Sequence, residues 1–215
     1  MDSLTLEEAR RLFGDRLVEP ADAAAVLGSS SSAPTTVPFS AAEAAVAREN
    51  GCFLIYRPKH AADGGPVTLA RLLERAGSGK PSGFQGDDPW FAERPFASSD
   101  AIEPGWALFH AEPWRETLNC TYERASAILR ERSTAMAWRR RRAAEIAFDC
   151  LVVAKARDLR LLERFWDWST TASEDGGFVN VGGFTAKGLE VLSYSPAVKH
   201  GALGICPTLV RPDAR

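Results

Sequence analysis

A nearly continuous apolar run reads Ile146-Ala147-Phe148-Asp149-Cys150-Leu151-Val152-Val153-Ala154, and Asp149 is its only charged member. A helix that is apolar around most of its circumference is buried on most of its sides. We therefore expect a helix from about Thr134 to Arg157 whose second half lies at the centre of the domain.

Two short helices are expected at the N-terminus. Thr5 and Glu8 have the spacing of a capping box, and Pro20 is placed for the first turn of a second helix. The expected helices span residues 6–13 and 20–27. The stretch 29–38 is rich in Ser and Pro and has the composition of a linker. The sequence thus divides into a helical arm at 1–28, a linker at 29–38 and a domain at 39–215.

The first half of that domain mixes helices and strands. The runs 52–57 and 105–111 are apolar and rich in β-formers, which is typical of buried strands. Ser40 with Glu43 repeats the capping-box pattern. Helices are expected at 41–49, after Thr68 with Leu69, Leu72 and Leu73, and at 114–132, with one helical turn at 88–91.

From Trp166 onward the pattern changes to strands separated by glycine turns. Strands are expected at 178–181, at 189–194 and over 203–211, where Pro207 interrupts the last one as it would at a sheet edge. The residues from 165 to 215 are therefore the β-rich part of the domain. We predict an α+β fold, in which a helical middle packs on an antiparallel sheet and a short N-terminal αα unit precedes it.

Composition is that of a soluble globular protein. Lys and Arg total 26 against 28 Asp and Glu, which gives a net charge of −2 and excludes a globally basic nucleic-acid coat. The first residues lack the basic and apolar regions of a signal peptide, and no apolar run is long enough to span a membrane. The four cysteines form no CxxC pair. We expect a cytoplasmic bacterial protein with reduced, buried cysteines and no bound metal or cofactor.

The clearest electrostatic signal is an arginine-rich segment, expected to be helical, at 124–142. Seven arginines stand there against one glutamate, Glu131. Such a face suits an acidic protein partner or a nucleic acid, because guanidinium groups bind carboxylate and phosphate. A solvated helix face paired with acids elsewhere in the chain is the third possibility. Four consecutive arginines also surround a helix, so at least one must pair with an acid inside the protein. The binding residues expected here are Arg132, Arg139, Arg140, Arg141 and Arg142.

Six tryptophans are many for 215 residues. Trp90 and Trp114 lie beside prolines and expected loops, where exposed aromatic side chains serve as interface anchors. We therefore add Trp90 and Trp114 to the predicted binding residues. Core filling explains most of the others.

No catalytic motif is complete. The loop 77–82 resembles a phosphate loop, but it follows a helix and carries Pro81 where an amide donor is needed. A Cys120–His110 pair is a conceivable nucleophile and base. Glu174 and Asp175 lie in an apparent turn, which solvation explains more simply than calcium binding.

The segment from Trp168-Ser169-Thr170-Thr171 through Phe178-Val179-Asn180-Val181 to Gly204-Ile205-Cys206-Pro207 and Thr208-Leu209-Val210-Arg211 resembles the closing part of bacterial C-type-lectin-like modules. The overall layout also resembles uncharacterised bacterial proteins. The resemblance implies a non-enzymatic binding scaffold and carries over no catalytic residue.

These observations lead to two hypotheses. The first is a non-enzymatic, cytoplasmic protein of bacterial or mobile-element origin, including phage, that acts through protein–protein contacts. The second is a nucleic-acid-binding accessory protein that uses the arginine-rich segment 124–142. The sequence does not identify the partner or the oligomeric state.

Overall fold

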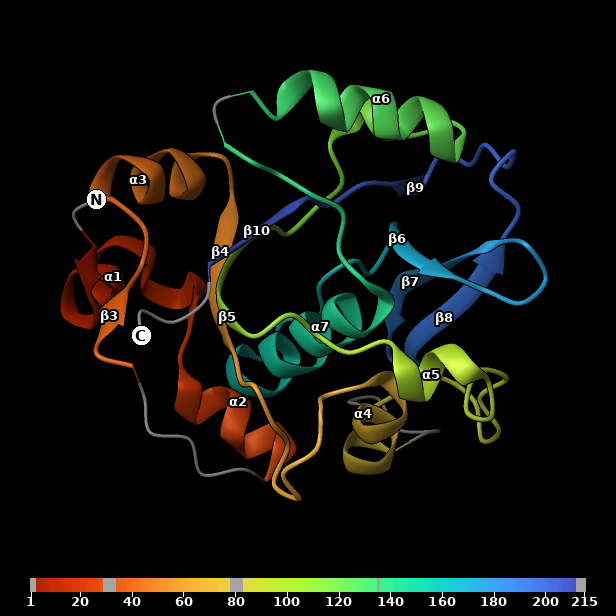
Figure 1. Ribbon diagram of the computed structural model, residues 1–215, viewed down its shortest axis with the longest axis horizontal. Coiled ribbons are helices and arrows are strands. Elements are labelled where there is room, and N and C mark those ends of the chain that lie inside the picture. Colours follow the sequence, from red (N-terminus) through yellow and green to blue (C-terminus); the bar gives the residue numbers. More distant parts are fainter. Residues whose placement is uncertain (1–2, 29–33, 78–82, 135, 212–215) are drawn as a thin grey trace.

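Helices and strands alternate along the chain and gather into two four-stranded sheets around one central helix (Figure 1). The computed structural model describes residues 3–28, 34–77, 83–134 and 136–211. The α-helices are α1 Leu6–Phe13, α2 Pro20–Leu27, α3 Ala41–Glu49, α4 Leu69–Ala76, α5 Pro95–Ser99, α6 Tyr122–Arg132 and α7 Ala143–Arg157. The strands are β1 Leu4–Thr5, β2 Leu17–Val18, β3 Thr36–Val37, β4 Cys52–Arg57, β5 Gly105–His110, β6 Trp166–Ala172, β7 Phe178–Thr185, β8 Gly188–Tyr194, β9 Leu203–Gly204 and β10 Thr208–Arg211. The fold is α+β, as the sequence predicts.

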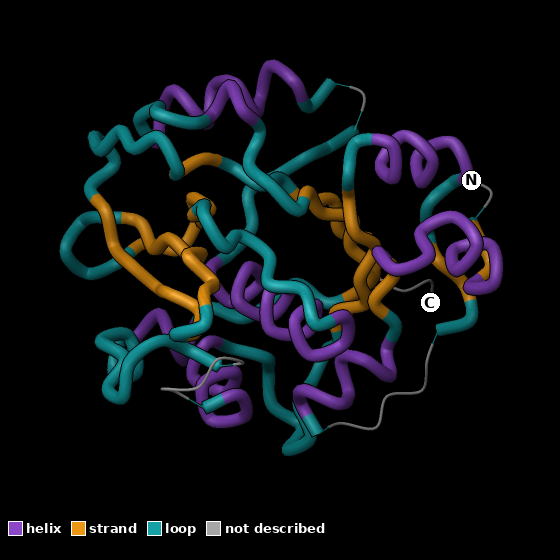
Figure 2. The backbone as a smooth tube through the Cα atoms, turned by 180° about the vertical axis from the view of Figure 1, so that it is seen from behind, coloured by secondary structure: helices purple, strands orange, loops and turns teal. Residues whose placement is uncertain are grey.

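Helix α7 is the central helix. Every residue from Ala143 to Val153 is buried, and these include the charged Glu145 and Asp149. The helix contacts α2, α4 and β2 on one side and β6 and β7 on the other (Figures 1 and 2). The central position is confirmed, but the expected start near Thr134 is wrong, because α7 begins only at Ala143.

The first sheet has the strand order β10-β5-β4-β2. Strands β4 and β5 are buried at every position and pair antiparallel, as do β5 and β10. Strand β2 joins β4 in parallel. The two apolar runs at 52–57 and 105–111 are therefore confirmed as central strands.

The second sheet has the order β8-β7-β6-β9. Here the expectation of one sheet needs correction, because the run 203–211 supplies two strands to two different sheets. Strand β9 pairs with β6 in the second sheet and β10 pairs with β5 in the first. Each lies at an edge, as Pro207 between them predicted.

The N-terminal segment docks on the domain. Strand β1 pairs with β3, and β2 belongs to the first sheet. Arg157 at the end of α7 donates to the carbonyl oxygens of Asp15 (3.1 Å) and Leu17 and pairs with Asp22 (3.0 Å). Both predicted helices have the expected bounds, and Thr5 and Glu8 form the capping box. Residues 29–33 of the predicted linker lie outside the described residues.

The region expected as one helix at 114–132 is a short 3-10 turn, 115–117, followed by α6. Helix α6 packs on the face of the second sheet opposite α7, where the Tyr122 and Phe178 rings stack with centroids 3.7 Å apart. Residues 90–93 form a turn rather than the helical turn expected at 88–91. Among the described helices, none is long and apolar enough to cross a membrane.

Candidate functional site

The four consecutive arginines are not helical. They form an extended connector between α6 and α7 that is bonded to both sheets. Arg139 exchanges two main-chain hydrogen bonds with Thr208 of β10 (2.8 and 2.9 Å), and the Arg141 carbonyl accepts from the Thr170 amide of β6 (2.9 Å). Main-chain pairing with distant strands has replaced the helical pattern. The arginine-rich helix expected at 124–142 is therefore corrected, because α6 ends at Arg132.

Arg141 of this connector lies inside the protein together with Arg57 of β4. Arg141 is 1 % exposed and bonds Asp149 (2.8 Å) and Asp167 (2.9 Å). Arg57 of β4 shares Asp149 (2.6 Å) and reaches Glu145 (3.0 Å). An arginine of this segment thus pairs with acids in the interior, as four consecutive arginines require. The guanidinium of Arg141 is fully engaged in these ion pairs and is not accessible at the protein surface.

The neighbouring arginines also have intramolecular partners. Arg139 binds Glu145 and Glu103, each at 2.7 Å. Arg140 is 5 % exposed and stacks on the Tyr122 ring, with 3.7 Å from its Cζ to the centroid. Arg142 donates to the Ala101 carbonyl (2.8 Å).

Arg132 and the two candidate tryptophans lie apart from that connector. The guanidinium of Arg132 sits over the Trp114 ring, with 4.4 Å from its Cζ to the centroid, and pairs with Glu116. Trp114 is itself buried, whereas Trp90 is 40 % exposed. The structure therefore brings Arg132 and Trp114 together and leaves Trp90 elsewhere.

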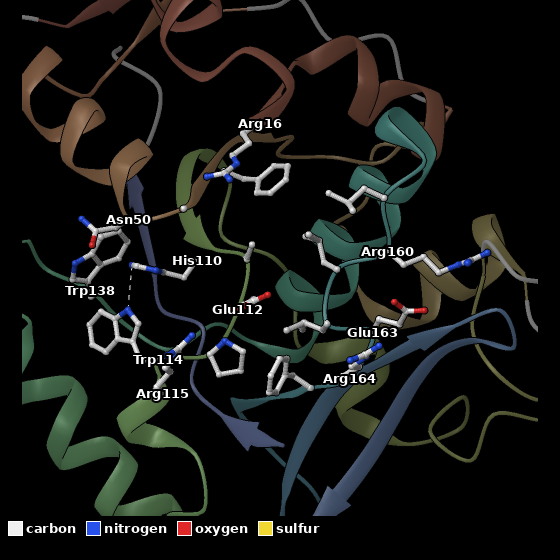
Figure 3. A pocket seen from close by; sticks show the side chains of 18 of the residues that line it. Arg16, Asn50, His110, Glu112, Trp114, Arg115, Trp138, Arg160, Glu163 and Arg164 are labelled. Carbon is white, nitrogen blue, oxygen red and sulfur yellow. Dashed lines mark hydrogen bonds between the residues drawn. The ribbon is translucent and has the colours of Figure 1, made fainter. Parts of the chain in front are cut away.

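Arg132 and Trp114 lie on the wall of a large groove, with a volume of about 1520 Å³. Its walls come from the turn before β2, the end of α3, the segment after β5, the segment after α6 and the segment after α7 (Figure 3). Segments far apart in sequence thus meet at one surface. The charged and aromatic residues of the groove are Asp15, Arg16, Phe53, His110, Glu112, Trp114, Arg115, Glu116, Arg132, Trp138, Arg157, Asp158, Arg160, Glu163, Arg164 and Phe165.

Four arginines of this groove form no ion pair within the described part of the chain, namely Arg16, Arg115, Arg160 and Arg164. Four carboxylates of the same lining are likewise without an ion-pair partner there, namely Asp15, Glu112, Asp158 and Glu163. In Figure 3, Arg16 lies toward the His110 end of the groove. Arg160 and Arg164 lie with Glu163 at the opposite end. Charges of both signs are therefore available along the groove.

Two exposed apolar side chains also line the groove. Val46 of α3 is 49 % exposed and Leu159 after α7 is 45 % exposed. Among the described residues these are two of the three exposed large hydrophobic side chains. Both side chains therefore offer apolar surface to a molecule that enters the groove.

The wall after α7 has a fixed and unusual backbone. Asp158 ends the helix with φ 51°, and Leu162 has φ 56°. A left-handed conformation is uncommon for a leucine and persists only where surrounding structure enforces it. The Leu162 side chain is buried in the core, and its carbonyl accepts from the Phe165 amide (3.2 Å). These contacts set the orientation of the segment that carries Arg160 and Arg164.

His110 lies at one end of the groove between two tryptophan rings. Trp114 Nε1 donates to His110 Nε2 (3.2 Å), and the Trp138 centroid is 5.0 Å from the imidazole centroid. Since Nε2 accepts this bond, the proton of the neutral ring is on Nδ1. Burial, together with the charges of Arg132 and Arg141, lowers the pKa of His110 to about 4.

This geometry predicts that His110 stays neutral at pH 6. We expect the long-range nitrogen–proton NMR spectrum of its ring to show one protonated nitrogen, Nδ1, and one unprotonated nitrogen. At pH 3, below the pKa, both nitrogens should carry protons. The Trp114→Phe variant removes the donor to Nε2 and should alter that nitrogen's shift. An imidazolium at pH 6 would contradict the arrangement.

The Cys120–His110 pair has no geometric support. Cys120 Sγ contacts the Glu116 carbonyl oxygen at 3.5 Å, and His110 Nε2 is bonded to Trp114. No hydrogen bond joins the cysteine to the histidine in the described residues. The other three cysteines are free and buried, and burial raises the pKa of the Cys52 and Cys150 thiols to about 12.

The remaining sequence candidates add no site. Residues 78–82 of the glycine-rich loop lie outside the described residues. Asp175 accepts from Ser173, Ser193 and the Gly177 amide at a hairpin turn, while Glu174 is exposed. Over the described ranges, no group of three or more His, Cys, Asp or Glu side chains could hold a metal ion.

Sequence reasoning missed most of the groove. The four arginines without an ion-pair partner in the described residues come from three separate segments, so no single cluster marks the groove. The one available signal is the run 157–164, which carries three arginines and an apolar Leu159 beside a helix end.

Comparison of the chain with protein-family models, with curated proteins and with solved structures gave no match. The resemblance of the C-terminal segment to C-type-lectin-like modules is untested by these comparisons and stays a prediction.

Proposed function

We propose that this is a non-enzymatic binding protein that acts through contacts with another protein, and that the groove receives an extended segment of that partner. One observation carries the proposal. The groove collects four arginines without an ion-pair partner in the described residues and two of the exposed large hydrophobic side chains. A peptide can pair with the arginines and also cover the apolar side chains, because its own side chains can be acidic at one position and apolar at the next.

The charge pattern favours a protein over a nucleic acid. A phosphate backbone is uniformly negative and is bound by surfaces of uniform positive charge. The groove instead intersperses five carboxylates among its arginines. The connector 139–142, on which the nucleic-acid alternative rested, has its guanidinium groups paired or buried. The free cysteines support placing the protein in a compartment that keeps thiols reduced, such as the cytoplasm.

The test compares partner capture by three forms of the tagged protein, each with and without nuclease. The groove variant is Arg160→Glu with Arg164→Glu. The matched control is Arg124→Glu with Arg130→Glu, which makes the same charge change on the exposed side of α6. We expect a protein that survives nuclease with the wild type and the control, and at least about tenfold less of it with the groove variant, because like charges at an interface repel.

Two outcomes would contradict the proposal. Equal recovery by the groove variant would remove the groove from the interaction. Recovery that disappears with nuclease would instead support nucleic-acid binding. That alternative also predicts binding of labelled DNA or RNA that weakens steeply with salt.

A further inference from the structure

Strand β8 lies at the outer edge of the second sheet, and only part of this edge is covered. The Leu189 amide donates to the Gly83 carbonyl (2.9 Å), and the Leu189 carbonyl accepts from the Gln85 amide (2.9 Å). These two bonds make the parallel bridge between Phe84 and Leu189. The chain around Phe84 therefore begins a fifth strand beside β8.

That added strand stops after one residue pair. Gly86 turns the chain away with φ +83°. At the next outward position, the Val191 carbonyl accepts from the indole Nε1 of Trp90 (2.6 Å) instead of from a main-chain amide. Main-chain groups alternate in direction along a strand, so the N–H and C=O of Ser193 face outward as those of Leu189 do. In the described part of the chain, no main-chain group pairs with Ser193 from that side.

A hollow of about 370 Å³ lies beside this open position. Its lining is Trp90, Arg94, Ser173, Glu174, Asp175, Leu192, Ser193 and Tyr194. Trp90 is 40 % exposed, yet its ring is fixed by the bond to Val191 and by contact with Phe96, at 5.8 Å between centroids. The Trp90 indole is therefore held in a fixed position and is partly exposed to water beside the open edge of β8.

The charged side chains around the Trp90 indole favour the binding of a cation. Glu174 and Asp175 outnumber Arg94 in the lining. The carboxylate of Asp175 is held by Ser193, Ser173 and the Gly177 amide, so its position is set. The Arg94 guanidinium lies 6.0 Å from the Trp90 centroid, at the outer limit for a cation–π contact. The tryptophan face can therefore attract a further cation beside the acids.

We propose that β8 binds an extended segment of a partner protein at Ser193, with a Lys or Arg side chain of that segment seated against Trp90 and near Glu174. Strand addition supplies main-chain hydrogen bonds for affinity, and a side-chain pocket supplies specificity. This site is separate from the groove and does not depend on the function proposed for it.

The experiment uses a displayed library of random hexapeptides selected on the wild-type protein. Selected peptides are then measured on Ser193→Pro and Ser193→Ala. Proline removes both the hydroxyl and the outward N–H and is tolerated at an edge, whereas alanine removes the hydroxyl alone and keeps the N–H. We expect binding at least about tenfold weaker to Ser193→Pro and within about twofold of wild type for Ser193→Ala, because one main-chain hydrogen bond is lost only with proline.

A third variant tests the side-chain preference. Glu174 is exposed, and reversal to Lys should turn the selected position from Lys or Arg to Asp or Glu. Should Ser193→Pro fail to fold by circular dichroism, peptides N-methylated at single positions give the same test on the wild-type protein. Equal binding to the proline variant or to every N-methylated peptide, or no enrichment of peptides above background, would overturn the proposal.

Discussion

Replacement of Asp149 by asparagine is expected to lower the free energy of unfolding by about 3–5 kcal/mol, the range for removing one partner from a buried ion pair. Asp149 Oδ2 accepts from Arg57 (2.6 Å) and Arg141 (2.8 Å), and Oδ1 accepts from the Arg57 Nε (3.0 Å). All three side chains are buried. Asparagine keeps the shape but removes the charge, so two buried guanidinium groups lose their shared counter-ion.

The measurement is urea unfolding of the wild type and Asp149→Asn, with Glu131→Gln as the matched control. Glu131 pairs with Arg124 at 3.8 Å, and both side chains are about two-thirds exposed (66 % and 60 %). An exposed pair contributes about 0–1 kcal/mol, so the control should remain near the wild type. A loss below about 1 kcal/mol in Asp149→Asn would show that the arginines are satisfied by other groups.

Glu145 should make stability depend on pH between about 2 and 4.5. Burial raises the pKa of its carboxyl, but Arg57, Arg139 and the amide of Arg142 outweigh burial and lower it from 4.5 to about 2. The folded state therefore binds this proton less readily than the unfolded chain. The stabilisation is complete above pH 4.5 and is lost as the pH falls toward 2. At about 1.36 kcal/mol for each pKa unit, it is on the order of 3 kcal/mol.

The comparison of the wild type with Glu145→Gln isolates this contribution. Urea midpoints measured from pH 7 to pH 2 should differ between the two proteins by a constant amount down to about pH 4.5. The difference should then shrink as the pH approaches 2. Glu103, which reaches the same Arg139 from the surface, is present in both proteins and cancels. A difference that does not change with pH would mean that folding leaves the pKa of the Glu145 carboxyl at its unfolded value.

Local signals in the sequence predicted the elements whose hydrogen bonds are local. The capping boxes at Thr5 and Ser40 gave the correct helix bounds, because cap and helix lie within three residues of each other. The apolar run around Phe148 gave the central helix, since burial on all sides leaves no polar face. Helix caps and a continuous apolar run both depend on residues that are close together in the sequence.

Pairing between distant segments was the part that the sequence could not show. The connector Arg139–Arg142 has charge and spacing compatible with a helix, but its main chain bonds Thr208 and Thr170. The groove is likewise assembled from the ends of several elements, and its arginines come from segments that are far apart in the sequence. Trp90 and Trp114 were both predicted to be exposed. Trp90 is exposed, whereas Trp114 is buried, because the fold places Arg132 over its ring.

The sharing of Asp149 between two arginines also constrains how this sequence can change over generations. Arg57 comes from β4 and Arg141 from the connector, and both use the same oxygen of one carboxylate. Loss of either arginine leaves a negative charge partly uncompensated, and loss of the acid leaves two positive charges. Neighbouring substitutions of this kind are strongly non-additive. Descendants of this chain are therefore expected to keep the three residues together or to exchange them as a set for apolar ones.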